Sequence, residues 1–454
     1  MGSGADASRL PGERPRRRGQ GLPSITWPTS ASTPFTSLPS FSRPPNHRYH
    51  THDYEKVDPM LGSNEGPPRA GRRGSCAKYA RRPLDGVFNH ASRGSFSFTT
   101  SSRTARTRAY LDWFSVSGFP INAYDLGGAP AYKAWWGLPA APKFNTRHPG
   151  RARFLWGIGR KWVEFGIDGW RLDVANEIDD DEFWRGVRRR IRAINPEAYI
   201  VRRSGRVDTL LNQGDVAGRR DELPVHTRCL AFFVGPSINE ELIRPAESLP
   251  GGSARRRDVP GRIERLQEIY PWNVTSVMLN LLGGDMARLI SLANGDRTAA
   301  QLATLFQMTY PGAPSIYYGD EIGLPGAHDP DNRRAFPWHD TASWDTDLLH
   351  DFQRMIALRQ RSTMLSAGAV AAILHAADDV FDYRTRIVES EVIVVAFNVA
   401  TTPRRFDVDL ANLTGPDAAF EEAWAGRSHR LEGCLRRLEL ESRSARVLIH
   451  ARPA

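Results

Sequence analysis

Hydrophobic positions along the chain follow regular spacings in some segments and none in others. Residues 153–165 carry a helical stripe of apolar side chains, at Phe154, Leu155, Ile158, Trp162 and Phe165. Residues 166–173 have the pattern of a short strand. Residues 183–191 return to helical spacing, after three aspartates at 179–181 that suit a helix N-terminus. A helix, a strand and a helix in this order indicate the βα units of an α/β protein.

The C-terminal residues, 366–454, carry a second kind of pattern. They contain strand-like runs, such as the Val-Ile-Val-Val-Ala-Phe-Asn sequence of residues 392–398. We therefore expect a small antiparallel β domain behind the preceding α/β domain.

In four segments, 1–45, 63–83, 94–108 and 202–226, the apolar residues follow neither helical nor alternating spacing. These segments are rich in Arg, Pro, Gly, Ser and Thr, and together they carry a net charge of +13. The net charge of the whole chain is +10, so all other residues sum to −3. We expect these four segments to be irregular.

Composition limits the classes of protein that the chain can belong to. Its 454 residues are 40% hydrophobic and 25% charged, which favours a packed domain the size of a large barrel with a small appendage. It contains no run of 18 apolar residues that could span a membrane. The three cysteines, Cys76, Cys229 and Cys434, exclude a disulfide framework and match no metal-ligand spacing.

The basic segments allow several interpretations. They could be solvated loops and an N-terminal tail. A targeting peptide is disfavoured because residues 1–45 lack an apolar region after their arginines. A nucleic-acid-binding arm is disfavoured because few aromatic residues are interleaved with the arginines and no known module surrounds them.

Two motifs carry candidate chemistry. Residues 85–90, Asp-Gly-Val-Phe-Asn-His, predict a strand that ends in Asn89 and His90, and barrel enzymes place catalytic groups at such strand ends. A simple turn is the alternative. Within residues 168–173, strand alternation puts Arg171 and Asp173 on one face, where an ion pair would keep the carboxylate charged. A charged carboxylate suits nucleophilic attack on an anomeric carbon, and a purely structural ion pair is the alternative.

Three further motifs stand in the chain in order with these two: Asn-His-Arg-Tyr-His-Thr-His-Asp-Tyr at 46–54, Asn-Leu-Leu-Gly-Gly-Asp at 280–285 and Tyr-Tyr-Gly-Asp-Glu-Ile-Gly at 317–323. With them, the chain resembles the α-amylase family of glycoside hydrolases. Residues 122–127, 138–139 and 143–146 favour its neopullulanase and cyclomaltodextrinase branch. The resemblance covers about 46–62, 84–93, 109–201 and 227 to near the C-terminus.

The resemblance implies a role for several residues. Asp173 matches the catalytic nucleophile, Arg171 the arginine that orients it, and Asp285 the second catalytic aspartate, which stabilises the distorted sugar. Further residues match groups that bind the sugars at and beside the cleavage point: His90, Tyr49, and the pair Asp329 and Arg333. Aromatic residues that could line the groove, with packing as the alternative, are Trp135, Trp136 and Phe144.

The implied fold is α/β: a (β/α)8 TIM barrel over 46–365 with a short loop domain after its third strand, then the C-terminal antiparallel β domain over 366–454. Residues 1–45 form an irregular segment ahead of the barrel. We expect this chain to lack the family's usual N-terminal β domain and the loop that often carries calcium, and therefore to hold no metal and no cofactor.

The departures from the family pattern concern the chemistry directly. The general acid/base glutamate should follow the strand Tyr199-Ile200-Val201, but Arg203 stands in its place. Asp285 follows two glycines and lacks the family's preceding histidine. Retaining hydrolysis needs two carboxyl groups, and an arginine does not donate a proton near neutral pH.

The family fold also requires barrel strands within residues 1–45 and 202–226. Neither segment has the residue pattern of a strand, so the barrel could be incomplete as written. A fourth interpretation of the basic segments follows. Shifted frames of GC-rich DNA encode Arg, Pro, Gly, Ser and Ala, so these segments could be out-of-frame translation.

The sequence thus predicts a retaining hydrolase for the α-1,4 bonds of maltooligosaccharides, cyclodextrins or related glucans, with α-1,6 bonds as an open alternative. A glucan-binding pseudoenzyme without the acid is the second candidate, and an arginine-rich nucleic-acid binder is the third. We expect an α-glucan partner, no nucleic acid, no membrane and a cytoplasmic location. The oligomeric state stays open.

Overall fold

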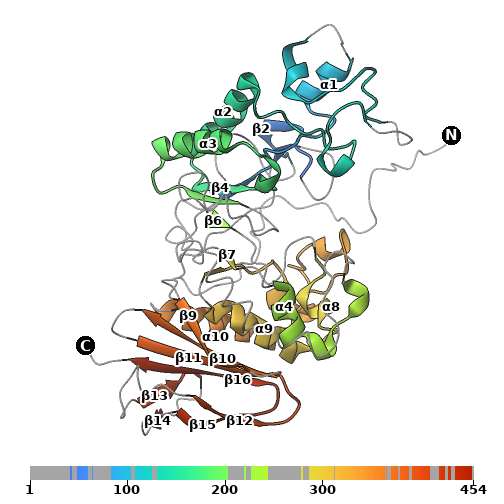
Figure 1. The fold of residues 1–454 in the computed structure, drawn as a ribbon. Coiled ribbons are helices and arrows are strands. Elements are labelled where there is room, and N and C mark those ends of the chain that lie inside the picture. Colours follow the sequence, from blue (N-terminus) through green and yellow to red (C-terminus); the bar gives the residue numbers. More distant parts are fainter. Residues whose placement is uncertain are drawn as a thin grey trace, which may run out of the picture.

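The structure, a computed structural model, describes residues 41–42, 49–59, 64, 83–103, 108–124, 130–202, 219–220, 226–243, 278–279, 286–310, 312–362, 365, 370–376, 379–387, 391–408, 419–424, 428–430 and 435–451. Most of the segments 1–45, 63–83 and 202–226 lies outside these residues. Figure 1 shows one body with α1, α2, α3 and β4, a second with α4, α8, α9 and α10, and the C-terminal sheet beside the second body.

A parallel sheet forms the centre of the first body. Its strands are β3 (Pro83–Gly86), β4 (Gly169–Leu172), β5 (Tyr199–Arg202) and β6 (Arg219–Arg220), in the order β3-β4-β5-β6. The register pairs Asp85 with Arg171 and Trp170 with Ile200. A separate antiparallel pair joins β1 (Phe41–Ser42) to β2 (Asp53–Val57).

Two amphipathic helices cover this sheet, as their spacing predicts. Helix α2 (Pro149–Phe165) ends at Gly166, whose φ of +108° is a left-handed conformation that glycine adopts without a Cβ clash. Helix α3 (Asp181–Ile194) begins after Asp180, whose carboxylate accepts a hydrogen bond from the backbone N–H of Phe183. The aspartate cluster at 179–181 therefore caps α3, and this expectation is confirmed.

Close packing at β4 depends on one glycine. Gly169 lies so near the backbone of β5 that a Cβ atom there would overlap the carbonyl oxygen of Tyr199. The next residue, Trp170, is fully buried, and its indole N–H donates to the carbonyl of Gly159 on α2 at 3.0 Å. The sheet and α2 are thus held together at the strand that leads to Asp173.

The segment after β3 contains helix α1 (Phe96–Arg103) and the 3-10 helices η3 (Arg108–Trp113) and η4 (Trp135–Gly137). This corrects the expectation that 94–108 is irregular, because α1 occupies most of that segment. One side chain anchors the helix. Phe98 is fully buried and packs edge-on against Phe114 and Tyr132, with ring centroids 5.0 and 4.9 Å away. A single apolar anchor gives no periodic pattern in the sequence.

The second body contains four α-helices within the described residues: α4 (His226–Phe233), α8 (Leu289–Leu292), α9 (Arg297–Thr309) and α10 (Thr346–Arg361). Strands β7 (Met278–Leu279) and β8 (Ala313–Pro314) pair in parallel. The segment after β8 carries the short 3-10 helices η10 (Asp320–Ile322) and η11 (Asp331–Arg333). The buried Arg359 of α10 donates to the carbonyls of Met308 and Tyr310 at 2.7 and 3.1 Å, which ties α10 to the end of α9.

The C-terminal residues form antiparallel sheets, as their pattern predicts. One has the order β14-β13-β16-β11-β10-β9, and β12 pairs with β15 in another. The strands are β9 (Val370–Ala376), β10 (Val380–Ile387), β11 (Glu391–Asn398), β12 (Arg404–Val408), β13 (Ala419–Glu422), β14 (Ser428–Arg430), β15 (Leu435–Leu440) and β16 (Ser444–Ala451).

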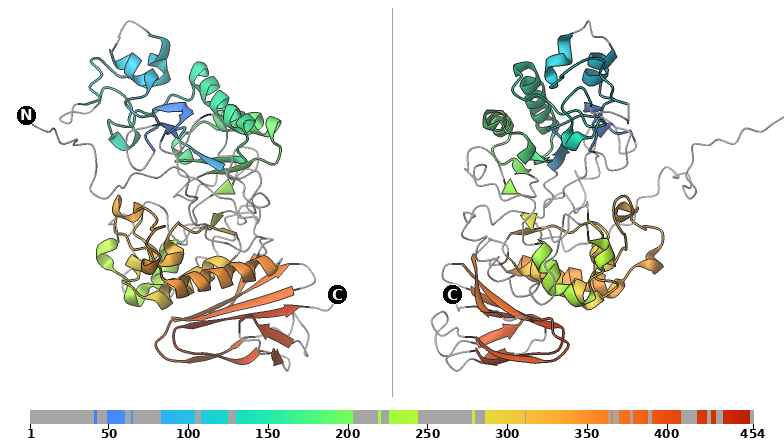
Figure 2. Two further views of the ribbon diagram at one scale, coloured as in Figure 1. Left: turned by 180° about the vertical axis from the view of Figure 1, so that it is seen from behind. Right: turned by 45° about the vertical axis from the view of Figure 1, so that its right-hand side comes forward.

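Strand β11 is buried on both faces, which explains its continuous apolar sequence. Ile393, Val395 and Phe397 join the core that includes α9 and α10, and alternate residues such as Val394 face the smaller core with Phe406. Figure 2 shows the sheet stacked on the long helix of the second body.

Candidate active site

Neighbouring parallel strands bring Asp85, Arg171 and Asp173 together. Arg171 on β4 lies in register with Asp85 on β3, and Asp173 follows β4 directly. The backbone N–H of Asp173 donates to the carbonyl of Gly86 at 3.1 Å, which fixes the end of β4 against the end of β3. Asp173 is almost completely buried, with 1% of its surface exposed. The structure therefore places the predicted nucleophile at the carboxyl end of a sheet strand, where barrel enzymes carry their sites.

Arg171 contacts two carboxylates and one phenol. Its Nη1 forms an ion pair with Oδ2 of Asp85, lies 3.9 Å from Oδ1 of Asp173, and lies 3.3 Å from the hydroxyl of Tyr49. The predicted contact between Arg171 and Asp173 is present, but Asp85 is the closer partner. Sequence reasoning missed this role of Asp85, because the register between β3 and β4 cannot be seen in either strand alone.

His90 is enclosed beside this cluster. The Asn89 amide lies 3.3 Å from Nδ1 of His90, and Nε2 lies 3.1 Å from the backbone oxygen of Tyr49. A neutral ring that carries its proton on Nε2 satisfies both contacts, because Asn89 then donates to Nδ1 and Nε2 donates to the carbonyl. The imidazole stacks on the indole of Trp135, with ring centroids 4.6 Å apart and planes within 6°.

Tyr54 holds the loop that presents His90. Its hydroxyl is 2.7 Å from the carbonyl oxygen of Val87 and 2.7 Å from that of His90. Burial raises the pKa of this phenol, so it stays protonated and can donate to these carbonyls. The loop after β3 is thus fixed from β2, as the predicted site requires.

Asp329 and Arg333, the other predicted substrate-binding residues, lie after β8 in the second body. They form an ion pair with 3.0 Å between Nε of Arg333 and Oδ2 of Asp329. The structure therefore brings these two predicted partners to each other.

A second group of ionisable residues lies near β8, where Asp320 lines a small pocket. The fully buried Arg288 side chain contacts the carbonyl of Tyr318 and lies 3.4 Å from Oδ1 of Asp320. Burial raises the pKa of Asp320 to about 7, and the neighbouring Glu321 adds to this effect while Arg288 opposes it. Burial likewise raises the pKa of Glu321.

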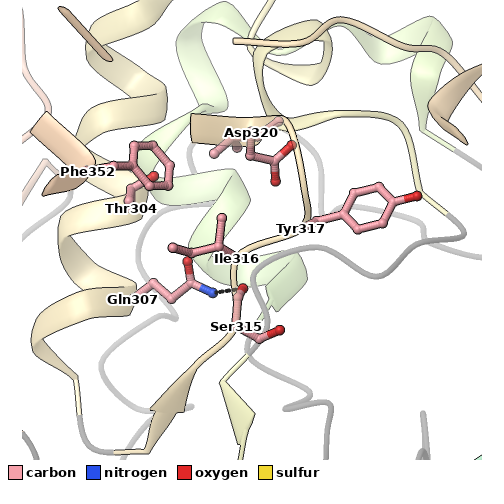
Figure 3. Close-up of a pocket in the computed structure, with 8 residues that line it drawn as sticks. Thr304, Gln307, Ser315, Ile316, Tyr317, Asp320 and Phe352 are labelled. Carbon is pink, nitrogen blue, oxygen red and sulfur yellow. Dashed lines mark hydrogen bonds between the residues drawn. The ribbon is translucent and has the colours of Figure 1, made fainter. Parts of the chain in front are cut away.

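Figure 3 shows Asp320 and Tyr317 at this pocket, with the amide of Gln307 donating to the carbonyl of Ser315. The pocket holds about 10 Å3, roughly the space of one water molecule. It is too small for a sugar.

Two predicted positions lie outside the described residues: Asp285, and Arg203 at the place of the expected glutamate. Strand β5 ends at Arg202, directly before the latter. Among the described residues there is no group of three or more His, Cys, Asp or Glu side chains arranged to hold a metal ion. Nor does that part of the chain contain a helix long and apolar enough to cross a membrane.

Comparison with known proteins identifies the family. The α-amylase catalytic domain matches residues 35–190 and 259–368. The chain belongs to the α-amylase family. It therefore has the (β/α)8 barrel fold with a C-terminal antiparallel β domain, and the described parallel strands β3–β6 and β7–β8 are two parts of such a barrel.

The relatives named by this comparison include the branch predicted from the sequence. A cyclomaltodextrinase from Bacillus sp is 36% identical over 73% of this chain and 56% of its own length. Neopullulanase 2 from Thermoactinomyces vulgaris is 34% identical over 73% of this chain and 53% of its own. The chain thus spans about half the length of these curated relatives.

Solved structures match over more of the chain. The debranching enzyme from Nostoc punctiforme superposes with a TM-score of 0.79 and 33% identity, covering 91% of this chain and 84% of that one. The predictions of the family, its branch and its fold are confirmed.

Proposed function

We propose that the chain is a retaining glycoside hydrolase for α-1,4-glucosidic bonds of maltooligosaccharides, cyclodextrins or related α-glucans, with α-1,6 bonds as a second candidate linkage. The observation that carries the proposal is the buried Asp173 at the end of β4, beside Arg171, whose other neighbour Tyr49 contacts the enclosed His90. The names of the relatives, cyclomaltodextrinase and neopullulanase, support the substrate class.

The reaction assigned to Asp173 has two steps. One carboxylate oxygen attacks the anomeric carbon and the glycosidic C–O bond breaks. Because Arg203 stands at the place of the general acid, the leaving oxygen takes its proton from water, which becomes hydroxide. A second water then attacks the glycosyl ester and gives its proton to that hydroxide, which frees Asp173 and releases a sugar with the original anomeric configuration. Arg171, whose Nη1 lies 3.9 Å from Oδ1 of Asp173, would orient the nucleophile.

The remaining site residues enter as proposals. Asp285 would stabilise the positive charge that develops on the sugar ring. Tyr49 and His90 would bind the sugar at the cleavage point, and Asp329 with Arg333 the next glucose. We also propose the divisions 1–45, 46–365 and 366–454 for the irregular segment, the barrel and the β domain. A cytoplasmic location stays a prediction, and the oligomeric state stays open.

The second candidate, a glucan-binding pseudoenzyme, is favoured by one feature of the sequence. Arg203 stands where the acid is expected, and loss of a general acid costs a factor on the order of 10²–10⁴ in rate. Such a protein would bind maltooligosaccharides through the same residues and release no product.

Glucose release from maltotriose separates the two candidates. The native chain is compared with the double variant Arg202→Gly/Arg203→Glu, which places Gly-Glu after Val201, and with Asp173→Asn as the inactive control. The proposal expects the native chain to release glucose in a reaction that depends on Asp173, with an α-anomeric product by NMR, and the double variant to act faster. Binding of maltotriose by the native chain without turnover would establish the pseudoenzyme instead.

A further inference from the structure

Arg288 is a fully buried arginine in the second body. Only 1% of its surface is exposed, and its guanidinium carbon lies 3.9 Å from the ring centroid of Tyr317 and 4.5 Å from that of Tyr318. Its Nη2 is buried without a hydrogen-bond partner among the residues that the structure describes. Burial of a charge and of an unpaired donor costs free energy, so an apolar side chain would suit a position that only fills space. The polar contacts of Arg288 therefore indicate what its charge contributes.

Arg288 binds both ends of the segment that carries the proposed sugar-binding pair, residues 318–333. Near the start of this segment, Nη1 donates to the carbonyl of Tyr318 and lies 3.4 Å from Oδ1 of Asp320. Near its end, Nε donates to the carbonyl of Asn332 at 2.7 Å. A planar guanidinium can bind several acceptors in fixed directions at once. One side chain thus sets the distance between the two ends of the segment.

The middle of the segment is fixed to the same stretch of chain. The carbonyl of Gly326 accepts from the backbone N–H of Arg288 at 2.9 Å, and its N–H donates to Oγ of Ser291 at 2.9 Å. A Cβ atom at Gly326 would lie 2.8 Å from Cα of Asn332 and 3.0 Å from Cγ of Arg288, so the packing leaves no room for a side chain. The amide of Asn332 also donates to the carbonyl of Met286 at 2.8 Å.

We propose that Arg288 is a positioning residue, which holds Asp329 and Arg333 in place to bind the next glucose unit of the α-glucan. This rests on the proposed function and adds to it a residue that favours substrates with a second glucose unit. Arg333 directly follows Asn332, so a shift of Asn332 would displace one member of the ion pair. Arg288 stands three residues after Asp285 in the sequence. The same stretch of chain would then carry the second catalytic aspartate and support the binding of the neighbouring sugar.

Two substrates with one leaving group measure this effect: p-nitrophenyl α-maltoside and p-nitrophenyl α-glucoside. The p-nitrophenolate anion leaves without a proton, so Arg203 at the place of the general acid does not prevent the assay. Only the maltoside offers a glucose unit to Asp329 and Arg333. The ratio of kcat/KM for the maltoside to kcat/KM for the glucoside, from the initial release of p-nitrophenolate, therefore measures the binding of that unit in the transition state.

Arg288→Lys is the decisive variant. Lysine keeps the charge but has a single ammonium group, which cannot bind the acceptors at both ends of the segment as the planar guanidinium does. We expect the ratio to fall about tenfold, as in Asp329→Ala, through a higher KM for the maltoside. Arg359→Lys is the matched control, because it changes another buried arginine that donates to backbone carbonyls, at the end of α9. It should leave the ratio unchanged.

Gly326→Ala decides the question should Arg288→Lys not fold. It keeps the arginine, and its methyl group would overlap Asn332 and displace the end of the segment, so the ratio should fall in the same way. Thermal unfolding of each variant identifies the temperatures at which the ratio is measured on folded protein.

The outcomes separate the role of Arg288 from the proposed function. If the parent releases no p-nitrophenolate in a reaction that depends on Asp173, the proposed function and the role of Arg288 both fail. If the parent is active and Asp329→Ala leaves the ratio unchanged, the roles of the ion pair and of Arg288 fail, and the hydrolase stands. If Asp329→Ala lowers the ratio and Arg288→Lys does not, the role of Arg288 alone fails. An equal fall in Arg359→Lys would make general destabilisation the cause and overturn that role as well.

Discussion

Arg171 on β4 and Asp85 on β3 form a buried ion pair across two parallel strands. The Asp85 carboxylate is 1% exposed, and the Arg171 side chain is 13% exposed. Arg171 also reaches Asp173, the proposed nucleophile, and Tyr49, the proposed sugar-binding aromatic. We therefore expect Asp85 to act as a positioning residue for Arg171.

The variant Asp85→Asn tests this relationship. Removing one charge of a buried pair leaves the other uncompensated, so we expect the free energy of unfolding to fall by about 3 kcal/mol. Urea unfolding measures it. Arg160→Met, which breaks the exposed pair with Glu164, is the matched control and should cost no more than about 0.5 kcal/mol. Equal effects of the two variants would contradict a special role for the buried pair.

A separate readout distinguishes positioning from simple stability. Within the proposed function, Asp85→Asn lets Arg171 move toward Asp173. We therefore expect kcat for maltotriose to fall, and KM to change less than kcat, at temperatures where the variant is fully folded. A variant that is less stable but has an unchanged kcat would show that Asp85 contributes to stability alone.

Gly169→Ala should disrupt the sheet. A methyl group there would overlap the carbonyl of Tyr199, and the two strands cannot separate without breaking their ladder. We expect a loss of several kcal/mol or no folded protein, measured by circular dichroism and thermal unfolding. Gly157→Ala, in α2, is the control: nothing lies within 4 Å of its added methyl group, and it should stabilise the protein by about 0.5–1 kcal/mol.

Asp320 predicts a pH dependence of stability. Folding raises the pKa of Asp320 from 3.8 to about 7, so between pH 3.8 and pH 7 its carboxyl is protonated in the folded state and ionised in the unfolded state. The contribution of Asp320 to the free energy of unfolding is fully present below pH 3.8. It is lost as the pH rises to about 7, by at most about 1.4 kcal/mol per pH unit. Arg288 and Glu321 are the charged groups that oppose and reinforce this shift.

Urea unfolding of Asp320→Asn at pH 5 and pH 8 measures this contribution. The amide cannot ionise, so the decrease in stability between the two pH values should be smaller than in the parent. Asp347→Asn changes an exposed carboxylate and is the control. An identical decrease in the parent and in Asp320→Asn would show that Asp320 does not titrate in this range.

The sequence predicted those elements whose signals lie within a few neighbouring residues. Helices α2 and α3, the Asp180 cap and the C-terminal strands all follow from spacing and capping within a few residues. Helix α1 was missed because a single buried residue, Phe98, anchors an otherwise Ser- and Thr-rich segment. The pairing of Arg171 with Asp85 was missed because their contact depends on register between strands 86 residues apart.

The same distinction applies to the candidate site. Asp173, Arg171, His90 and Tyr49 were placed by resemblance to the family, and the structure brings them together at the ends of β3 and β4. His90 and Trp135 are 45 residues apart in the sequence, so the spacing of residues could not predict that their rings stack. The positions of Asp285 and Arg203 relative to this cluster stay predictions.

The coding DNA of residues 202–226 provides the last test. If this segment is out-of-frame translation, one of the other two frames should encode Gly-Glu soon after Val201. Sequencing an independent clone shows whether an insertion or deletion precedes Arg202. The corrected chain should then hydrolyse maltotriose faster by a factor on the order of 10²–10⁴, because it regains the second carboxyl group. If neither frame encodes Gly-Glu, Arg203 is genuine, and the chain is a divergent, inactive homologue that lacks the general acid.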